Sequence, residues 1–278
     1  MNDFIKTLLK KGNGLKMMNK ERRFDEVLDQ IGLIKGDIID LSSDLIAMAL
    51  EYRKLKEDFD PNLIIDFLQE KVGEEGTICI RTWNWGFCHD KTFDYRNTPS
   101  EVGALGDVAL KRKDFNRTKH PIYSFAVWGK HQNVLCEMDN KSAWGSDSPF
   151  AFFTENGGKQ LMLGSTMWNS LTYVHYVEEQ VGVKYRFLKD FTAPYIDENG
   201  IESIKTYSMN VRNLDLDINM NSEKFADDFY EKGILKTGFL NKTSISTVML
   251  KGAYEIIKED ILNNRSRKIC TYIGQEDY

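Results

Sequence analysis

Short, mostly apolar runs alternate with helix-spaced segments in the first third of the chain. The runs at 38–41 and 77–80 each follow a glycine-containing turn and span only four residues, which is typical of buried strands. The segments 45–55 and 62–72, which lie between these runs, have the spacing and N-terminal residues of helices. This order predicts an α/β unit near the N-terminus.

The remainder of the chain carries further strand and helix signals. Aromatic residues are frequent in the otherwise irregular stretch 81–118, which argues against disorder. An Asn156–Gly157 pair between apolar runs at 150–153 and 160–163 predicts a β-hairpin. The other predictions are a strand at 122–128, strands around a turn at Asn199–Gly200 within 185–211, and helices at 171–180 and 247–262. One α/β domain with an elaborated aromatic middle accounts for this organisation.

Composition and charge exclude several classes of protein. Of the 278 residues, 41% are apolar and 28% are charged, which is ordinary globular usage. The net charge of −5 disfavours a nucleic-acid partner, because such proteins need a basic surface for the phosphates. Four cysteines without a CxxC pair argue against a zinc site and a dense disulfide framework. No signal-peptide pattern and no run of the ~18–20 apolar residues that spans a bilayer is present, so we expect a cytoplasmic protein without a metal.

Histidine is scarce, so each of the four histidines is a distinct candidate for proton transfer. Imidazole suits acid–base chemistry near neutral pH, because its ordinary pKa is about 6.5. His175 falls within the predicted helix 171–180, where Thr172 and Glu178 lie three positions before and after it and share its face. A hydroxyl, an imidazole and a carboxylate on one face can form a polar site. A core histidine beside a surface glutamate fits the same spacing.

A series of short motifs in a fixed order is more specific than any of them alone. In chain order they are GD at 36–37, SS at 42–43, GT at 76–77, FD at 93–94, TPS at 98–100, RTKHPIYS at 117–124, DSP at 147–149, LMLG at 161–164 and TYVHYVE at 172–178. Their order and spacing resemble the aminoglycoside 3-N-acetyltransferase family over roughly residues 25–230. Within that family, the stretches 83–85, 93–99 and 175–179 look most like members found among surface-polysaccharide biosynthesis enzymes.

The resemblance and the pattern of elements together predict the architecture. We expect an α/β fold with three α/β/α layers, a mixed central sheet and an elaborated aromatic loop region. A single acetyltransferase domain is expected to span 1–278. It would consist of an N-terminal helical extension at 1–24, a family-like core at 25–230 and a C-terminal helical part at 231–278.

The resemblance also implies a reaction. Members of the family transfer acetyl from acetyl-coenzyme A to an amine by direct attack on the thioester, and the family's catalytic histidine corresponds to His175, which implies a general base there. An acidic residue further along the chain orients that histidine, with Asp217 as the first candidate and Asp215 as the second. Thr172 shares the catalytic stripe. Glu178 is expected to contact the acceptor amine or to fix the helix.

The coenzyme site is implied by two further motifs. Ser42 and Ser43 form the family's serine turn, where a helix N-terminus would favour a pyrophosphate, although a plain N-cap fits the same residues. Ser124, Arg117 and His120 belong to a second motif that lines the same cleft in the family. Arg117 is expected to pair with a phosphate, and His120 is expected to be mainly structural.

The acceptor class implied by the resemblance is an amino sugar, free or nucleotide-linked. Trp83 and Asp94 are expected to contact it, with the aromatic loop stacking on a sugar or base face, although a local hydrophobic cluster fits the same aromatic residues. Three departures from the family pattern bear on acceptor identity and coenzyme affinity. Leu41 replaces a usual histidine, Arg81 replaces a common proline, and Asp44 lies beside the expected pyrophosphate site.

Four other functions remain open at this point. The chain could be an aminoglycoside 3-N-acetyltransferase that confers antibiotic resistance, or it could acylate another amine or carry another acyl group. It could be a non-catalytic relative that keeps a sugar pocket, although the retained His175 counts against this. A hydrolase with Ser124 as nucleophile is disfavoured, because the Gly-x-Ser-x-Gly elbow is missing.

Overall fold

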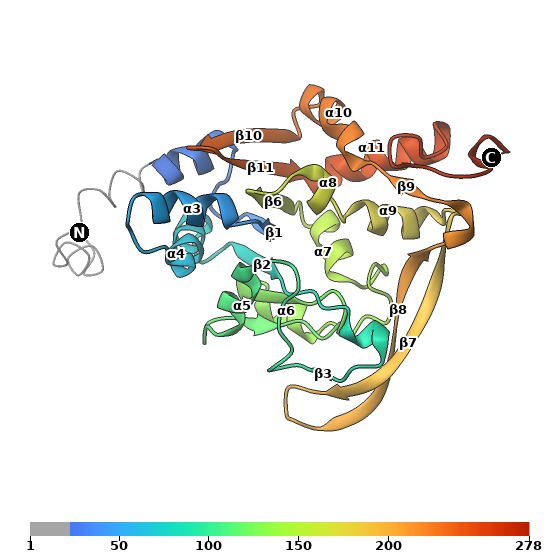
Figure 1. The fold of residues 1–278 in the computed structure, drawn as a ribbon, viewed down its shortest axis with the longest axis horizontal. Coiled ribbons are helices and arrows are strands. Elements are labelled where there is room, and N and C mark those ends of the chain that lie inside the picture. The colour runs from blue at the N-terminus through green and yellow to red at the C-terminus, as the bar shows by residue number, and fades with distance from the viewer. Residues whose placement is uncertain (1–22, 278) are drawn as a thin grey trace.

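The central element of the fold is a mixed β-sheet (Figure 1). The computed structural model describes residues 23–277, so the predicted extension at 1–24 lies almost entirely outside the described residues. Within the described part, seven strands run in the order β10-β11-β6-β1-β2-β5-β4. Their bounds are β1 (Ile38–Ser43), β2 (Thr77–Arg81), β4 (Asn116–Arg117), β5 (Phe125–Gly129), β6 (Lys159–Leu163), β10 (Leu235–Leu240) and β11 (Thr243–Met249). β1 is parallel to both β2 and β6, whereas the outer pairings are antiparallel. The predicted mixed sheet is confirmed.

Helices cover both faces of this sheet. Side chains alternate along a strand, so β1 sends Ile39 into one apolar core and Ile38 into the other, and β2 divides Ile78 and Cys79 in the same way. One core is shared with α3 (Ile46–Lys54), α4 (Pro61–Val72) and α5 (Ala104–Leu110), and the other with α7 (Pro149–Glu155), α9 (Val174–Val181) and α11 (Leu250–Asn263). The predicted three-layer arrangement is confirmed.

A long two-stranded ribbon projects beside the main sheet (Figure 1). It consists of β7 (Arg186–Ile196) and β8 (Glu202–Arg212), which pair antiparallel, with β3 (Phe93–Asp94) parallel to β7 at the far end. Asp197 organises the connecting turn, since its Oδ1 accepts hydrogen bonds from the backbone N–H groups of Asn199 and Ile201, both at 2.8 Å. The prediction of strands around Asn199–Gly200 is confirmed. The open end of the ribbon lies near the C-terminal end of α9.

The predicted hairpin at 150–163 is wrong. The apolar run 150–153 belongs to the helix α7, and Asn156–Gly157 connects this helix to β6. Ser148 caps the helix, because its Oγ accepts a hydrogen bond from the N–H of Ala151 at 3.4 Å, and Pro149 occupies the first turn. A four-residue apolar run fits a buried helix or a buried strand, and here the capping residues decide.

The C-terminal part differs from the prediction as well. The hairpin of β10 and β11 precedes α11, so the predicted helical part at 231–278 is helical only in its second portion. β11 extends the main sheet beside β6 and buries Ile245 and Thr247. The remaining elements are α6 (Gln132–Glu137), α8 (Met167–Ser170), α10 (Ala226–Glu231), β9 (Asn219–Met220), β12 (Cys270–Thr271), and the 3-10 helices η1 (Gly86–His89), η2 (Leu214–Leu216), η3 (Ser222–Phe225) and η4 (Gln275–Asp277). Among helices of residues 23–277, none combines the length and apolarity that crossing a membrane requires.

Candidate active site

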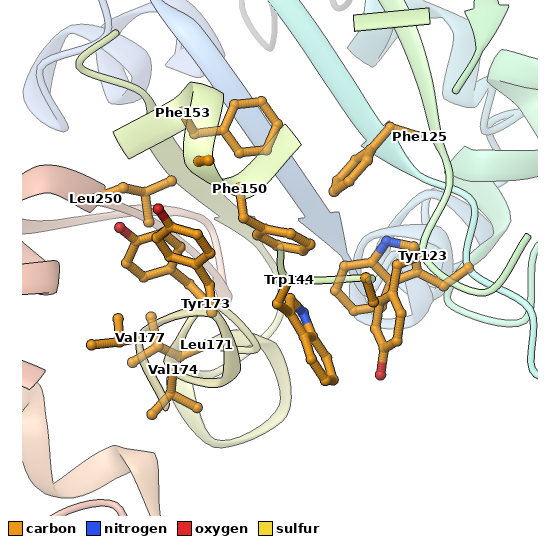
Figure 2. Packing of buried hydrophobic residues seen from close by; sticks show 14 of the residues in the cluster. Tyr123, Phe125, Trp144, Phe150, Phe153, Leu171, Tyr173, Val174, Val177 and Leu250 are labelled. Atoms are coloured by element: carbon orange, nitrogen blue, oxygen red, sulfur yellow. The ribbon is translucent and has the colours of Figure 1, made fainter. Parts of the chain in front are cut away.

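The helix α9 holds His175 at the edge of the apolar core. Val174 and Val177 are buried on the core side, and Figure 2 shows them grouped with Leu171 and Tyr173, close to Leu250 of α11. The side chain of His175 projects from a different part of the helix and keeps 19% of its surface exposed. Its ring packs edge-on against Trp144, with 5.1 Å between the ring centres. Apolar packing on one side therefore fixes the orientation of the imidazole on the other.

Glu178 binds the inner nitrogen of this imidazole. Nδ1 of His175 lies 2.6 Å from Oε2 of Glu178, so the predicted sharing of one helical face is confirmed. The carboxylate is fully buried, and its other partners are Arg186, whose Nε lies 2.7 Å from Oε2, and Tyr185, whose hydroxyl donates to Oε1 at 2.8 Å. Both oxygens are thus occupied within the protein. The predicted contact of Glu178 with the acceptor amine does not fit this enclosure.

The charges around His175 favour its neutral form. Burial lowers the pKa of His175 below its ordinary 6.5, and the positive charge of Arg186 lowers it further, against the opposing effect of Glu178. Burial by itself would raise the pKa of Glu178, but Arg186 and His175 outweigh this and bring it below its ordinary 4.5. A neutral imidazole beside a carboxylate carries its proton on Nδ1. Nε2 is therefore the acceptor nitrogen of the ring, and the donor that the described residues bring to it is Nη2 of Arg186 at 3.5 Å, where a hydrogen bond is weak.

A cavity of about 710 Å³ has His175 in its wall. That size is in the usual range for small-molecule sites, which is roughly 300–1,000 Å³. Trp85, Tyr123 and Trp144 line one side, and Figure 2 shows the rings of Tyr123 and Trp144 next to one another. The other lining residues come mostly from the ribbon and the segment after it: His175, Arg186, Phe187, Lys189, Phe191, Met209, Asn210, Val211, Arg212, Asn213, Leu214, Asp215 and Met220. The arrangement can accept a proton from a molecule bound in the cavity.

The predicted orienting aspartates occupy other positions. Asp215 lies in η2 and lines the cavity, whereas Asp217 ends η2 with a positive φ of 46° and is exposed. Within residues 23–277, neither forms a hydrogen bond with His175, and Glu178 stands where Asp217 or Asp215 was expected. Thr172 precedes α9, because the helix begins only at Val174. Its backbone carbonyl accepts a hydrogen bond from the N–H of His175 at 2.9 Å, so its connection to the site runs through the main chain.

The predicted coenzyme turn is not a turn, because Ser42 and Ser43 are the last two residues of β1, and neither lines the cavity. Ser42 is buried, and its Oγ lies 3.3 Å from Oγ of Ser165. Ser43 is partly exposed. Asp44 accepts a hydrogen bond from the N–H of Ile46 at 3.0 Å and so occupies an amide at the start of α3. The plain capping alternative does not hold for the two serines either, because the N-cap of α3 is Leu45, which has no side-chain capping hydrogen bond.

The second predicted coenzyme motif is enclosed in the protein. Arg117 is 2% exposed and donates from Nε to Ser124 Oγ at 3.0 Å, from Nη1 to the Thr98 carbonyl at 2.6 Å and from Nη2 to the Thr82 carbonyl at 3.0 Å. All three guanidinium nitrogens donate within the protein and the side chain is buried, so the predicted phosphate contact of Arg117 does not fit. Ser124 is fully buried, which leaves it out of reach of a ligand.

His120 fits its predicted structural role. Its Nδ1 accepts hydrogen bonds from the N–H groups of Ile122 at 3.3 Å and Tyr123 at 3.2 Å, which tie the turn before β5. Burial lowers the pKa of His120 from 6.5 to about 4, so this ring stays neutral in the folded protein near pH 7.

The two residues predicted to contact the acceptor, Trp83 and Asp94, make their contacts within the protein. Trp83 is 4% exposed and packs against Tyr123 and beneath the guanidinium of Arg81, so it belongs to the hydrophobic cluster that was the alternative. Asp94 closes its own turn by accepting hydrogen bonds from the N–H groups of Arg96 and Asn97 at 2.9 and 3.1 Å. Neither lines the cavity, whereas Trp85, two residues after Trp83, does.

Several residues of the site had escaped sequence reasoning. Tyr185 and Arg186 begin the ribbon, and their contact with Glu178 depends on how β7 is placed against α9. The only hint in the sequence was Arg186 itself, a charged residue at the start of a strand whose side chains otherwise alternate. Trp144 carried no motif at all, because it lies in a loop and meets His175 only in three dimensions.

Comparison with known proteins defines the class. Residues 54–261 match the family model described as aminoglycoside 3-N-acetyltransferase, which covers well over half of the chain. The fold and this match define an N-acetyltransferase, and the chain belongs to the aminoglycoside 3-N-acetyltransferase family. The predicted family and enzyme class are therefore confirmed.

Similar proteins and structures agree with this assignment. Aminoglycoside N(3)-acetyltransferase III of Salmonella sp is 25% identical over 210 residues, which cover 69% of this chain and 71% of that protein. The SPbeta prophage-derived aminoglycoside N(3')-acetyltransferase-like protein YokD of Bacillus subtilis (strain 168) is 24% identical over 232 residues, 74% and 81% of the two chains. Among solved structures, AAC-IIIb in a binary complex with CoASH has a TM-score of 0.71 at 18% identity, covering 88% of this chain and 96% of that one. AAC(3)-Xa has a TM-score of 0.72 at 20% identity, covering 88% and 94%. The predicted co-substrate, coenzyme A, is thus the ligand of a protein with this fold.

Proposed function

We propose that the protein transfers acetyl from acetyl-coenzyme A to the amine of an amino sugar, with His175 as general base. The observation that carries the proposal is the position of His175 at the wall of the cavity, with Nδ1 held by Glu178 and Nε2 in only a weak contact with Arg186. Its partner Glu178 fixes the tautomer and stabilises the imidazolium that forms when Nε2 takes a proton. Arg186 in turn holds Glu178 in its charged form.

The reaction needs no covalent enzyme intermediate. The acceptor nitrogen attacks the thioester carbonyl carbon, and His175 Nε2 removes a proton from that nitrogen. The tetrahedral oxyanion then collapses, the carbon–sulfur bond breaks, and the departing coenzyme thiolate takes the proton from the imidazolium. The products are the acetamide and coenzyme A, and His175 returns to its neutral form.

An amino sugar for surface polysaccharide is the acceptor that we favour. Trp85, Phe187 and Phe191 line the cavity, and aromatic faces of this kind stack on sugar rings and bases. The stretches 83–85, 93–99 and 175–179 support the polysaccharide role through their resemblance to family members with that role. Aminoglycosides are the second candidate acceptors, because the similar proteins from Salmonella sp and Bacillus subtilis carry that substrate in their names.

The His175→Ala variant tests the base. We expect kcat to fall about 10²- to 10⁴-fold, the usual contribution of a general base, while coenzyme A binds with unchanged affinity. Thiol release with a panel of free and nucleotide-linked amino sugars and one aminoglycoside measures turnover, and calorimetry measures coenzyme binding. The matched control is His131→Ala, since His131 lies outside the cavity against Phe152. Unchanged turnover in His175→Ala would refute the assignment.

A further inference from the structure

The cavity carries more positive charge than its internal pairs account for. Its charged lining residues are Arg186, Lys189, Arg212 and Asp215. Arg186 is balanced by Glu178, which lies behind it. Within residues 23–277, neither Lys189 nor Arg212 forms an ion pair with a carboxylate. Lys189 Nζ lies 5.2 Å above the Phe191 ring, and Arg212 Nη1 donates to the Ile218 carbonyl at a long 3.5 Å.

The register of the ribbon places two of these positive charges opposite each other. Arg186 and Arg212 are direct partners across β7 and β8, and like charges in such positions destabilise a pair of strands. Glu178 neutralises the first arginine but does not pair with the second. Arg212 also acts on the site itself: after burial and Arg186, its charge contributes to lowering the pKa of His175. An anionic group bound in the cavity would complete the charge balance around Arg212.

We infer that Arg212, with Lys189, binds a phosphate group of the acceptor, so that the substrate is a phosphorylated amino sugar of the nucleoside diphosphate type. The inference rests on the proposed function and names the substrate class of the same site. A guanidinium suits phosphate because its parallel N–H groups match two oxygens, and Trp85 and Phe191 offer faces for a base. A polycationic aminoglycoside would instead place ammonium groups near Arg212 and Lys189.

Coenzyme A also carries phosphates, so the experiment must separate the two sources. Uridine diphosphate and thymidine diphosphate are titrated into the protein, with and without saturating coenzyme A. Tryptophan fluorescence reports binding, because Trp85 and Trp144 line the cavity. We expect at least one nucleotide to bind in both conditions, and Arg212→Gln to raise its Kd about tenfold, since a hydrogen bond between charged groups is lost. The control Arg53→Gln, an exposed arginine on α3, should leave Kd unchanged.

The second part of the experiment measures acetyl transfer to acceptors with and without a phosphate. With S-acetylpantetheine as a donor that has no phosphate, kcat/KM should be higher for UDP-glucosamine or glucosamine 1-phosphate than for glucosamine, and Arg212→Gln should remove most of that preference. Nucleotide binding that is unaffected by Arg212→Gln would overturn the inference. So would competition between coenzyme A and the nucleotides combined with weaker coenzyme binding in Arg212→Gln, because the phosphates near Arg212 would then belong to the coenzyme. His175→Ala should still bind the nucleotide. Nucleotide binding therefore tests the phosphate inference, whereas turnover of His175→Ala tests the base assignment separately.

Discussion

Of the buried polar clusters among residues 23–277, the Arg117 cluster and the Glu178 cluster make the sharpest comparison, because only the second reaches the cavity. The Arg117 cluster joins a guanidinium to Ser124 and to the carbonyls of Thr82 and Thr98. The Glu178 cluster joins a carboxylate to Arg186, Tyr185 and the imidazole of His175. Both clusters contain buried charged groups that are paired within the protein, so burial alone does not distinguish a ligand site from a structural cluster.

The two clusters differ in whether one of their polar groups remains available to a ligand. Each nitrogen of the Arg117 guanidinium donates to an acceptor of the protein, and the side chain is buried away from the cavity. In the Glu178 cluster, the carboxylate holds Nδ1 of the imidazole, and the ring lines the cavity with only a weak contact between Nε2 and Nη2 of Arg186. Substitutions should therefore affect stability in the first cluster and turnover in the second.

The largest effect is expected from Arg117→Met. This change keeps aliphatic packing over the Phe93 ring but leaves buried carbonyls without donors, at about 1–3 kcal/mol each. The free energy of unfolding, measured with urea, should fall by about 3–5 kcal/mol, and the folded fraction should keep its kcat. An Arg117→Met variant of native stability that no longer binds coenzyme A would show that the cluster is a ligand site after all.

Glu178→Gln should act mainly on the rate. An amide no longer fixes the tautomer of His175 or balances Arg186, so we expect kcat to fall about 100-fold, or about 2.7 kcal/mol. Steady-state thiol release measures the effect. Glu179→Gln is the matched control, because the neighbouring carboxylate accepts a hydrogen bond from Ser142 and does not line the cavity. Equal losses in the two variants would contradict the separation of the clusters.

His120 and His175 should divide the pH dependence between stability and rate. The pKa of His120 falls from 6.5 to about 4 on folding, so the unfolded chain binds more protons between these values. Stability is therefore complete above pH 6.5 and is lost as the pH falls, by about 2 kcal/mol at pH 5. His120→Asn should remove this part of the pH dependence. In contrast, kcat/KM should lose activity only below pH 6.5, because the pKa of His175 is lowered, and Arg186→Gln should move this limb to higher pH.

Tyr185→Phe should have the smallest effect. It removes one hydrogen bond to Glu178 Oε1 and leaves the contacts with His175 and Arg186 in place. A single hydrogen bond contributes roughly 0.5–1.5 kcal/mol, so kcat should fall about three- to tenfold. The pH profile of kcat/KM reports whether His175 is still held. A loss as large as that of Glu178→Gln would mean that Tyr185 itself touches the substrate.

Local patterns predicted the parts of the fold that local forces decide. The strands β1 and β2 and the alternating ribbon followed from apolar runs and turn residues. The structure of the run 150–153 was not predicted correctly, because its apolar pattern fits a helix as well as a strand. The cap at Ser148 decides in favour of the helix. β11 escaped prediction because it becomes a strand by pairing with β6, far away in the chain.

The contacts of the site also fall into those that local sequence predicts and those that depend on tertiary packing. The spacing of His175 and Glu178 within one helix was sufficient to predict that they meet. Arg186 comes from the next element, so its contact with Glu178 depends on tertiary packing. Nothing in the chain near Arg117 distinguishes a guanidinium that binds phosphate from one that binds carbonyls, because burial is a property of the whole fold.

A crystal structure with coenzyme A bound tests the central claim most directly. We expect the coenzyme sulfur in the cavity lined by Trp85 and Trp144, with room for a nitrogen about 3–3.5 Å from His175 Nε2 and beside the thioester position. A sulfur bound elsewhere, with His175 Nε2 separated from it by protein, would contradict the assignment of this imidazole as the base.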